Sequence, residues 1–91
     1  MKFKVYYVKN LKMSLEKTAA QVGHVMKELG RNCASSPEGD TCIVLGVSQT
    51  KFDNLIAEAV SMNRPMHVQV DSGRTEVVAG TRTAFGIIEE E

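Results

Sequence analysis

The alternation of strand-like and helix-like segments is the feature that most restricts how this chain can fold. Residues 3–8 mix β-branched and aromatic side chains, which is typical of a strand, and a polar turn over residues 9–12 follows them. Apolar residues then recur at steps of three and four, which predicts a helix that begins after a Ser14 cap and ends at Gly30. The predicted buried stripe of this helix comprises Leu15, Ala19, Val22, Met26 and Leu29.

The same alternation continues to the end of the sequence. Residues Thr41–Val47 form an apolar run with few polar positions, which favours a central strand that is covered on both faces. Ser48 or Thr50 is the expected cap of a second helix, whose predicted buried stripe consists of Phe52, Leu55, Ile56, Ala59 and Val60. Residues 66–70 and 82–88 are the expected third and fourth strands.

This order of elements predicts an α/β fold. A strand, helix, strand, helix and strand in succession give two right-handed crossovers and a mostly parallel sheet, and the short return after Asp71 makes the fourth strand antiparallel. Residues 32–40 contain serine, proline and glycine, so a loop is expected there. The length of 91 residues is within the usual size of one domain, and residues 1–91 are therefore expected to form a single domain.

Cysteine content and the lack of long apolar segments bear on the cellular location. The sequence shows neither a signal-peptide pattern nor a segment long enough to cross a membrane. Cys33 and Cys42 are therefore expected to be free thiols in a cytoplasmic protein. Together with the distant His24 and His67 they lack the spacing of a zinc site, so no metal is predicted.

Charge is divided unevenly along the chain. The first 31 residues carry seven basic and two acidic side chains, and residues 38–91 carry four basic and nine acidic ones, so a formal net charge of zero hides values of +5 and −5. This balance argues against a protein coated in basic residues, but a basic first third can attract phosphate groups. The alternative, that these basic side chains are only solvated, stays open.

Polar side chains are predicted to gather where the parallel strands end. Ligands of open α/β sheets bind at the carboxyl ends of the strands, and three turns should meet there: residues 12–14, the turn at Ser48, and residues 71–75. Lys17, Gln21 and His24 lie at positions i, i+4 and i+7 of the first helix, roughly opposite its apolar stripe. They form either a solvated helix face or one side of a functional site.

Two motifs in the sequence resemble the signature of a known family. The first contains Lys12-Met13, Lys17, Ala19-Ala20-Gln21 and Gly23-His24, and the second contains Asp71, Gly73-Arg74-Thr75, Gly80-Thr81 and Thr83. In order and spacing both are similar to motifs of the archaeal and eukaryotic-type peptidyl-tRNA hydrolases (peptidyl-tRNA hydrolase II), and the chain resembles a short variant of that family. The resemblance implies a three-layer α/β/α fold with a mixed four-stranded sheet. It also implies hydrolysis of the ester that joins a peptidyl group to the terminal ribose of tRNA.

The resemblance further implies which residues carry the reaction. The catalytic positions fall on Lys17, Gln21, Asp71, Thr75 and Thr83, and the substrate-binding positions on Lys12, His24 and Arg74. Asp71 would accept a proton from water, directly or through Thr75, while Lys17 and Gln21 donate to the ester carbonyl oxygen. Phosphate contacts are expected from Lys9, Lys12 and the amino terminus of the first helix. No cofactor is implied.

The sequence departs from the family pattern in two places. Residues 9–11 lack the arginine and the acidic residue common before the Lys-Met pair, and residues 30–40 replace a segment that is longer by roughly 15 to 20 residues in the family. Two functions from different classes follow: an enzyme that acts on peptidyl-tRNA, or a non-catalytic binding or regulatory protein that retains the fold. A homodimer without membrane attachment is expected for either.

Overall fold

A computed structural model describes residues 1–31, 33 and 39–89. The chain passes in order through β1 (Lys2–Val8), a short 3₁₀ helix η1 (Lys9–Leu11), α1 (Leu15–Gly30), β2 (Thr41–Val47), α2 (Gln49–Ser61), β3 (Met66–Val70) and β4 (Arg82–Glu89). Every helix and strand expected from the sequence is therefore present, close to its predicted bounds. Most of the loop predicted for residues 32–40 lies outside the described residues.

The four strands form one mixed sheet in the order β2-β1-β4-β3. β1 pairs with β2 in parallel, whereas β4 is antiparallel to both of its neighbours, β1 and β3. The prediction of a mostly parallel sheet was wrong, although β1, β2 and β3 do run in the same direction. The reason is that β4 inserts between β1 and β3, so that two of the three neighbouring pairs are antiparallel.

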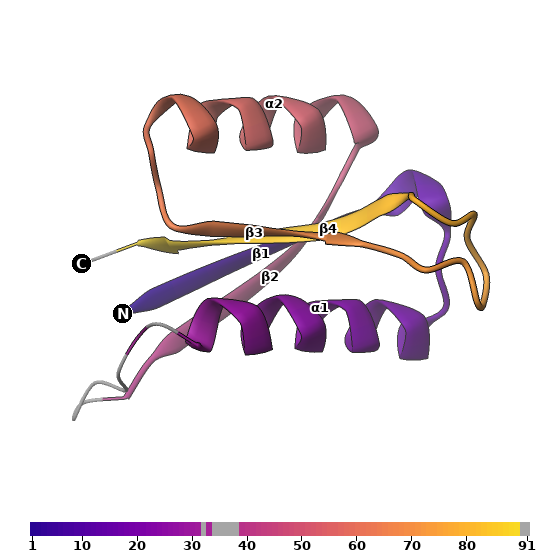
Figure 1. Ribbon diagram of the computed structural model, residues 1–91, viewed down its shortest axis with the longest axis horizontal. Coiled ribbons are helices and arrows are strands. Elements are labelled where there is room, and N and C mark those ends of the chain that lie inside the picture. Colours follow the sequence, from indigo (N-terminus) through magenta and orange to yellow (C-terminus); the bar gives the residue numbers. More distant parts are fainter. Residues whose placement is uncertain (32, 34–38, 90–91) are drawn as a thin grey trace.

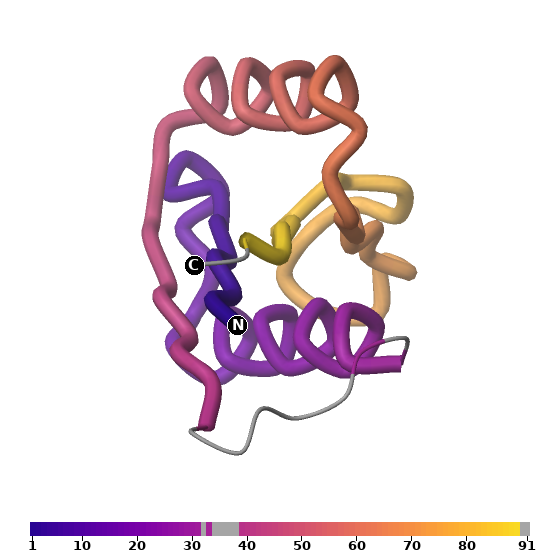
Figure 2. Tube along the Cα trace, turned by 90° about the vertical axis from the view of Figure 1, so that its left-hand side faces the viewer, coloured from indigo at the N-terminus to yellow at the C-terminus, as the bar shows by residue number. Residues whose placement is uncertain are grey.

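β2 is an edge strand, and the prediction that it is central and covered on both faces was wrong. It has one strand neighbour, and the side chains of Val44 and Leu45 are 44% and 43% exposed. Figure 2 shows β2 at the margin of the sheet, beside β1. An uninterrupted apolar run in the sequence does not by itself distinguish a buried strand from an apolar edge.

The two helices lie on opposite faces of the sheet, so a hydrophobic core forms on each face (Figure 1). On the α2 face the fully buried Phe85 ring stacks on Tyr6, at a centroid distance of 5.2 Å, and meets Phe52 edge-on at 5.3 Å. On the other face, Val25 and Leu29 of α1 pack against residues of the first and fourth strands, namely Phe3, Val5 and Ala84. Because β4 contributes to both cores, its central place in the sheet joins them.

α1 is rotated about its axis relative to the predicted orientation. Leu15 and Ala19 are exposed, whereas Gln21 is 3% exposed and shares the buried face with Val25 and Leu29. These three residues follow one another at steps of four, which places them along one line of the helix. The prediction that Gln21 lies opposite the apolar stripe was therefore wrong. A buried amide requires hydrogen-bond partners, and Gln21 finds one after β3.

α2 and the two cysteines mostly match the predictions. The side chain of Ser48 caps α2 by accepting a hydrogen bond from the Lys51 N–H, and Phe52, Ile56 and Ala59 are buried. Val60 is 65% exposed, so the buried stripe is narrower than predicted. Cys33 and Cys42 are free thiols. Among the described helices, neither is long and apolar enough to span a bilayer.

Candidate active site

A largely buried ion pair links α1 to the segment that follows β3. The Lys17 Nζ lies 2.6 Å from the Asp71 Oδ1, and only 13% and 5% of the two side chains are exposed. The residues are 54 positions apart in the sequence, and they meet because the start of α1 and the end of β3 lie at the same end of the sheet (Figure 1). Buried charges occur in pairs because an isolated one is costly to remove from water.

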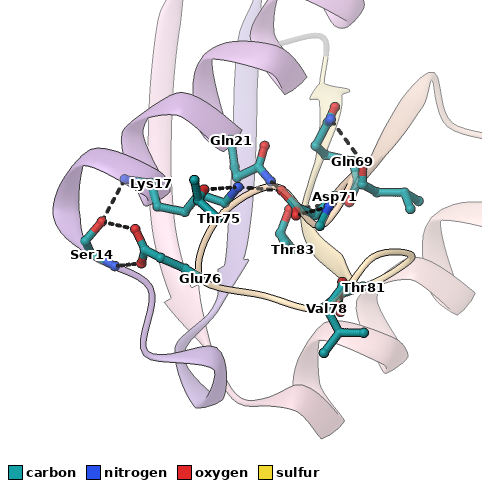
Figure 3. Close-up of polar contacts among 12 residues, drawn as sticks. Ser14, Lys17, Gln21, Gln69, Asp71, Thr75, Glu76, Val78, Thr81 and Thr83 are labelled. Carbon is teal, nitrogen blue, oxygen red and sulfur yellow. Dashed lines mark hydrogen bonds and ion pairs between the residues drawn. The ribbon is translucent and has the colours of Figure 1, made fainter.

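The Asp71 carboxylate accepts two further hydrogen bonds. The Gln21 Nε2 donates to Oδ1 over 2.8 Å, and the backbone N–H of Gly73 donates to Oδ2 over 2.7 Å (Figure 3). The bond from Gln21 also determines the orientation of its amide group, because only the amide nitrogen can donate to a carboxylate. Three groups thus fix the position of one carboxylate.

These donors change the acidity of Asp71. The hydrogen bond from Lys17 is the largest cause, followed by that from the Gly73 N–H, and together they hold the pKa of Asp71 below its ordinary value. The carboxylate is consequently ionised at neutral pH and is a weaker base than an ordinary aspartate. It can fix the position of donors and of a water molecule, but it accepts a proton less readily.

Residues 71–81 form a loop whose two ends are hydrogen-bonded to each other. The Asp71 N–H donates to the Thr81 carbonyl oxygen over 2.9 Å, and the Gly80 N–H donates to the Asp71 carbonyl oxygen over 2.9 Å. The loop folds tightly at Gly73, where φ is 81° and an added Cβ would lie 2.7 Å from Ala79. This closure returns Thr75 to α1, where its Oγ1 accepts a hydrogen bond from the Lys17 Nζ over 3.1 Å.

Thr83 lies behind this cluster on β4. It is the additional residue of a β-bulge, because Gln69 pairs with Ala84 and Val70 pairs with Arg82. The Thr83 side chain is fully buried, and its hydroxyl lies 3.5 Å from the Gln69 carbonyl oxygen. Figure 3 shows Thr83 beside Asp71. Because it is buried, Thr83 does not line the cleft described below.

An open cleft of about 360 Å³ exposes this cluster to solvent. Its lining combines α1, the end of β3 and the following loop, and consists of Lys17, Ala20, Gln21, His24, Gln69, Val70, Asp71, Ser72, Arg74 and Thr75. Of the predicted site residues, the cleft thus brings together Lys17, Gln21, Asp71 and Thr75 with His24 and Arg74. Lys12 is exposed and lies outside the lining. Lys17, Gln21 and His24, the polar stripe of α1, thus form one wall of this cleft.

The predicted meeting of three turns occurs only in part. Residues 12–14 and 71–76 are in contact, but Ser48 does not line the cleft. The start of α2 instead contacts the first turn, since the Asn10 Oδ1 accepts a hydrogen bond from the Gln49 N–H over 2.8 Å. This separation follows from the sheet order, which places β2 and β3 at opposite edges.

Sequence reasoning missed Glu76. Its carboxylate accepts hydrogen bonds from the Ser14 N–H and the Ser14 Oγ, each over 2.6 Å. The sequence predicts that the amino terminus of α1 binds a phosphate of the substrate. In the structure the Glu76 carboxylate is bound at this helix end. No pattern in the sequence indicates this contact, because 62 positions separate the two residues and Glu76 belongs to an irregular loop.

Comparison with known proteins leads to the same family as the two motifs. A sequence model with the description "Peptidyl-tRNA hydrolase PTH2" matches residues 1–90. No curated protein matches this chain significantly. The family match includes every helix and strand described above and all residues of the cleft.

Proposed function

This chain belongs to the peptidyl-tRNA hydrolase II family, and we propose that it hydrolyses the ester bond of peptidyl-tRNA, releasing tRNA and a peptide or an N-blocked amino acid. The observation that carries the proposal is the cluster of Lys17, Gln21, Asp71 and Thr75 in an open cleft. A purely structural ion pair would not require an adjacent amide and hydroxyl at a solvent-accessible surface. Because the substrate arises during translation, we place the protein in the cytoplasm.

Lys17 is the group that we propose stabilises the transition state. An ammonium group has three N–H donors, and Asp71 and Thr75 engage two of those on Lys17. The third remains for the ester carbonyl oxygen, which becomes negatively charged when water attacks. A fixed donor at a developing oxyanion contributes about 3 to 4 kcal/mol.

Asp71 and Thr75 position the attacking water in this proposal. The Thr75 Oγ1 accepts from Lys17, so its own O–H is free to donate to a water molecule. The ionised Asp71 then accepts a hydrogen bond from the same water and takes its proton as the water oxygen bonds to the carbonyl carbon. The ester C–O bond breaks next, and the proton passes to the departing ribose oxygen. Gln21 and Gly73 keep the carboxylate in place. Since the lowered pKa of Asp71 limits its strength as a base, most of the rate acceleration is assigned to Lys17.

The remaining predicted residues surround this centre. His24 and Arg74 line the cleft and are assigned to the terminal nucleotides of the tRNA, whose phosphates and bases suit a guanidinium and an aromatic ring. Lys12 is exposed after β1, outside the cleft, and is assigned to a more distant phosphate of the acceptor stem. Thr83 is assigned a supporting role under Asp71.

The proposed activity is tested by incubating the purified protein with N-acetylaminoacyl-tRNA and measuring release of the N-acetylamino acid. Turnover is expected from the parent protein. Lys17→Ala and Asp71→Ala proteins purified in the same way serve to exclude a contaminating hydrolase. If folded parent protein shows no turnover on intact substrate, the non-catalytic alternative replaces the enzyme, and retained tRNA binding would then identify it as a binding protein.

We further propose that the protein forms a homodimer through β2. This edge strand consists of Thr41–Val47, has no charged residue, and leaves Val44 and Leu45 nearly half exposed. Apolar edge strands without charges readily pair with a second strand. Light scattering after size exclusion is expected to show a dimer for the parent and a monomer for Val44→Lys, whereas Val60→Lys, on the exposed side of α2, remains dimeric. A monomeric parent protein contradicts this proposal.

A further inference from the structure

Ser14 and Glu76 form a second connection between α1 and the loop of residues 71–81. The Ser14 N–H donates to the Glu76 Oε1 and the Ser14 Oγ donates to the Glu76 Oε2, both over 2.6 Å (Figure 3). The same Ser14 Oγ caps α1 by accepting from the Lys17 N–H over 3.1 Å. One hydroxyl therefore connects the Glu76 carboxylate to the backbone of Lys17, whose ammonium group lies in the cleft.

The backbone at Glu76 is strained. Its φ is 61°, in the left-handed region that residues with a Cβ rarely adopt. The N–H of Val77 donates to the Thr75 carbonyl oxygen over 2.7 Å, which closes a three-residue γ-turn with Glu76 at its centre. A γ-turn with a positive central φ is the rare, unfavourable form, and such strain persists only where surrounding contacts impose it. The two short bonds to Ser14 are contacts of this kind.

The γ-turn directs two neighbouring side chains to two residues at the start of α1, its cap Ser14 and Lys17. Thr75 contacts the ammonium group of Lys17, and Glu76 contacts Ser14. Ser14 and Lys17 are joined in turn by the helix cap, and Thr75 and Glu76 are joined by the strained turn. The four residues thus form a closed ring of interactions.

We propose that Glu76 is a positioning residue, which through Ser14 and the strained turn keeps the Thr75 hydroxyl beside the Lys17 ammonium group. The ring explains why a carboxylate occupies the amino terminus of α1, where Ser14 holds the pKa of Glu76 below its ordinary value. Without the carboxylate the turn relaxes and Thr75 moves away, while Lys17 remains paired with Asp71. The kinetic part of this inference rests on the proposed function, whereas its structural part does not.

The structural part is tested by the mobility of the Thr75 methyl group, measured by NMR relaxation in the parent, in Glu76→Gln and in Glu16→Gln. Glutamine at position 76 has one accepting terminal atom, so its bond with the Ser14 Oγ is either lost or reversed, with the glutamine amide as donor. In both cases the charge that strengthens the two bonds in the parent is absent. Glu76→Gln is expected to increase the motion of Thr75. Glu16→Gln is the matched control, since Glu16 is an exposed carboxylate in the first turn of the same helix. Its Thr75 should move as in the parent.

The kinetic part is tested with a double-mutant cycle on N-acetylaminoacyl-tRNA. Glu76→Gln is expected to lower kcat by about tenfold, since a small displacement of a positioning group has effects of this size or larger. Glu16→Gln removes the same charge at the same end of α1 and is therefore the reference for KM. The KM of Glu76→Gln should lie within about twofold of the KM of Glu16→Gln. In a Thr75→Ala background, Glu76→Gln should lower kcat by less than about twofold further, because both changes remove one interaction.

The outcomes separate this inference from the proposed function. A Thr75 methyl group as ordered in Glu76→Gln as in the parent overturns the inference, whether or not the protein is active. An equal loss of kcat with and without Thr75 also overturns it, since Glu76 would then act on stability or on substrate binding. If the parent is inactive but Thr75 becomes mobile in Glu76→Gln alone, the proposed function fails and the positioning of Thr75 by Glu76 stands.

Discussion

Lys17→Ala is expected to lower kcat for peptidyl-tRNA by about 10²- to 10³-fold, the loss that follows removal of one oxyanion donor. KM should change far less, because the lost interaction is formed with charge that develops only in the transition state. The expectation depends on geometry: Asp71 and Thr75 orient the ammonium group, and one of its N–H donors remains available to the substrate. Single-turnover kinetics on N-acetylaminoacyl-tRNA would measure the change in the chemical step.

The control for this variant is Lys27→Ala. Lys27 is an exposed lysine in the last turn of the same helix, so its removal changes the net charge equally without reaching the cleft. Lys17→Ala also leaves the buried Asp71 without its cation, so rates should be compared per folded molecule, with folding verified by circular dichroism. A Lys17→Ala protein with nearly parental kcat would remove Lys17 from the chemistry and leave it as a structural ion pair.

The elements of this fold were predictable because each has a local signal. Ser14 and Ser48 cap the two helices as expected, because a serine hydroxyl before an apolar repeat satisfies free N–H groups of the first turn. The strand order was not predictable in the same way. The insertion of β4 between β1 and β3 depends on long-range pairing, and the β2 sequence, apolar throughout, gives no indication that the strand lies at an edge.

The candidate site was predictable where a motif identified it. Periodicity alone assigned Gln21 to the polar face of α1, and only the family motifs connected it with Asp71, which lies 50 positions further along the chain. The physical reason is that a buried amide with a carboxylate partner is stable in a core, but a helical repeat cannot specify that partner. Glu76 lay beyond both approaches, since its role depends on a strained turn in an irregular loop.

Asp71→Asn is expected to lower kcat about 100-fold and to change how stability depends on pH. The two carboxylate oxygens of Asp71 accept hydrogen bonds from Lys17, Gln21 and the Gly73 N–H. An asparagine side chain has only one accepting oxygen, and its other terminal atom is a donor. At least one of the three donors therefore loses its partner in Asp71→Asn. The arrangement that fixes the Lys17 ammonium group is thereby lost. Asp53→Asn is the matched control, because Asp53 is an exposed aspartate on α2 whose carboxylate accepts a hydrogen bond from the Gln49 side chain.

The pH dependence distinguishes a fixed carboxylate from an ordinary base. The pKa of Asp71 in the folded protein is lowered, chiefly by Lys17, relative to about 3.9 in the unfolded chain. Its contribution to the free energy of unfolding is therefore complete above about pH 5 and is lost as the pH falls through the folded pKa. Urea titrations should show that the difference in free energy of unfolding between the parent and Asp71→Asn shrinks below about pH 4. The pKa values of Glu76 and Glu89 are also lowered, but both residues are present in both proteins, so their contributions cancel in this difference. A difference that is unchanged or larger in acid would mean that Asp71 is not held as an anion by Lys17, and the assignment of Lys17 as the oriented donor would fail with it.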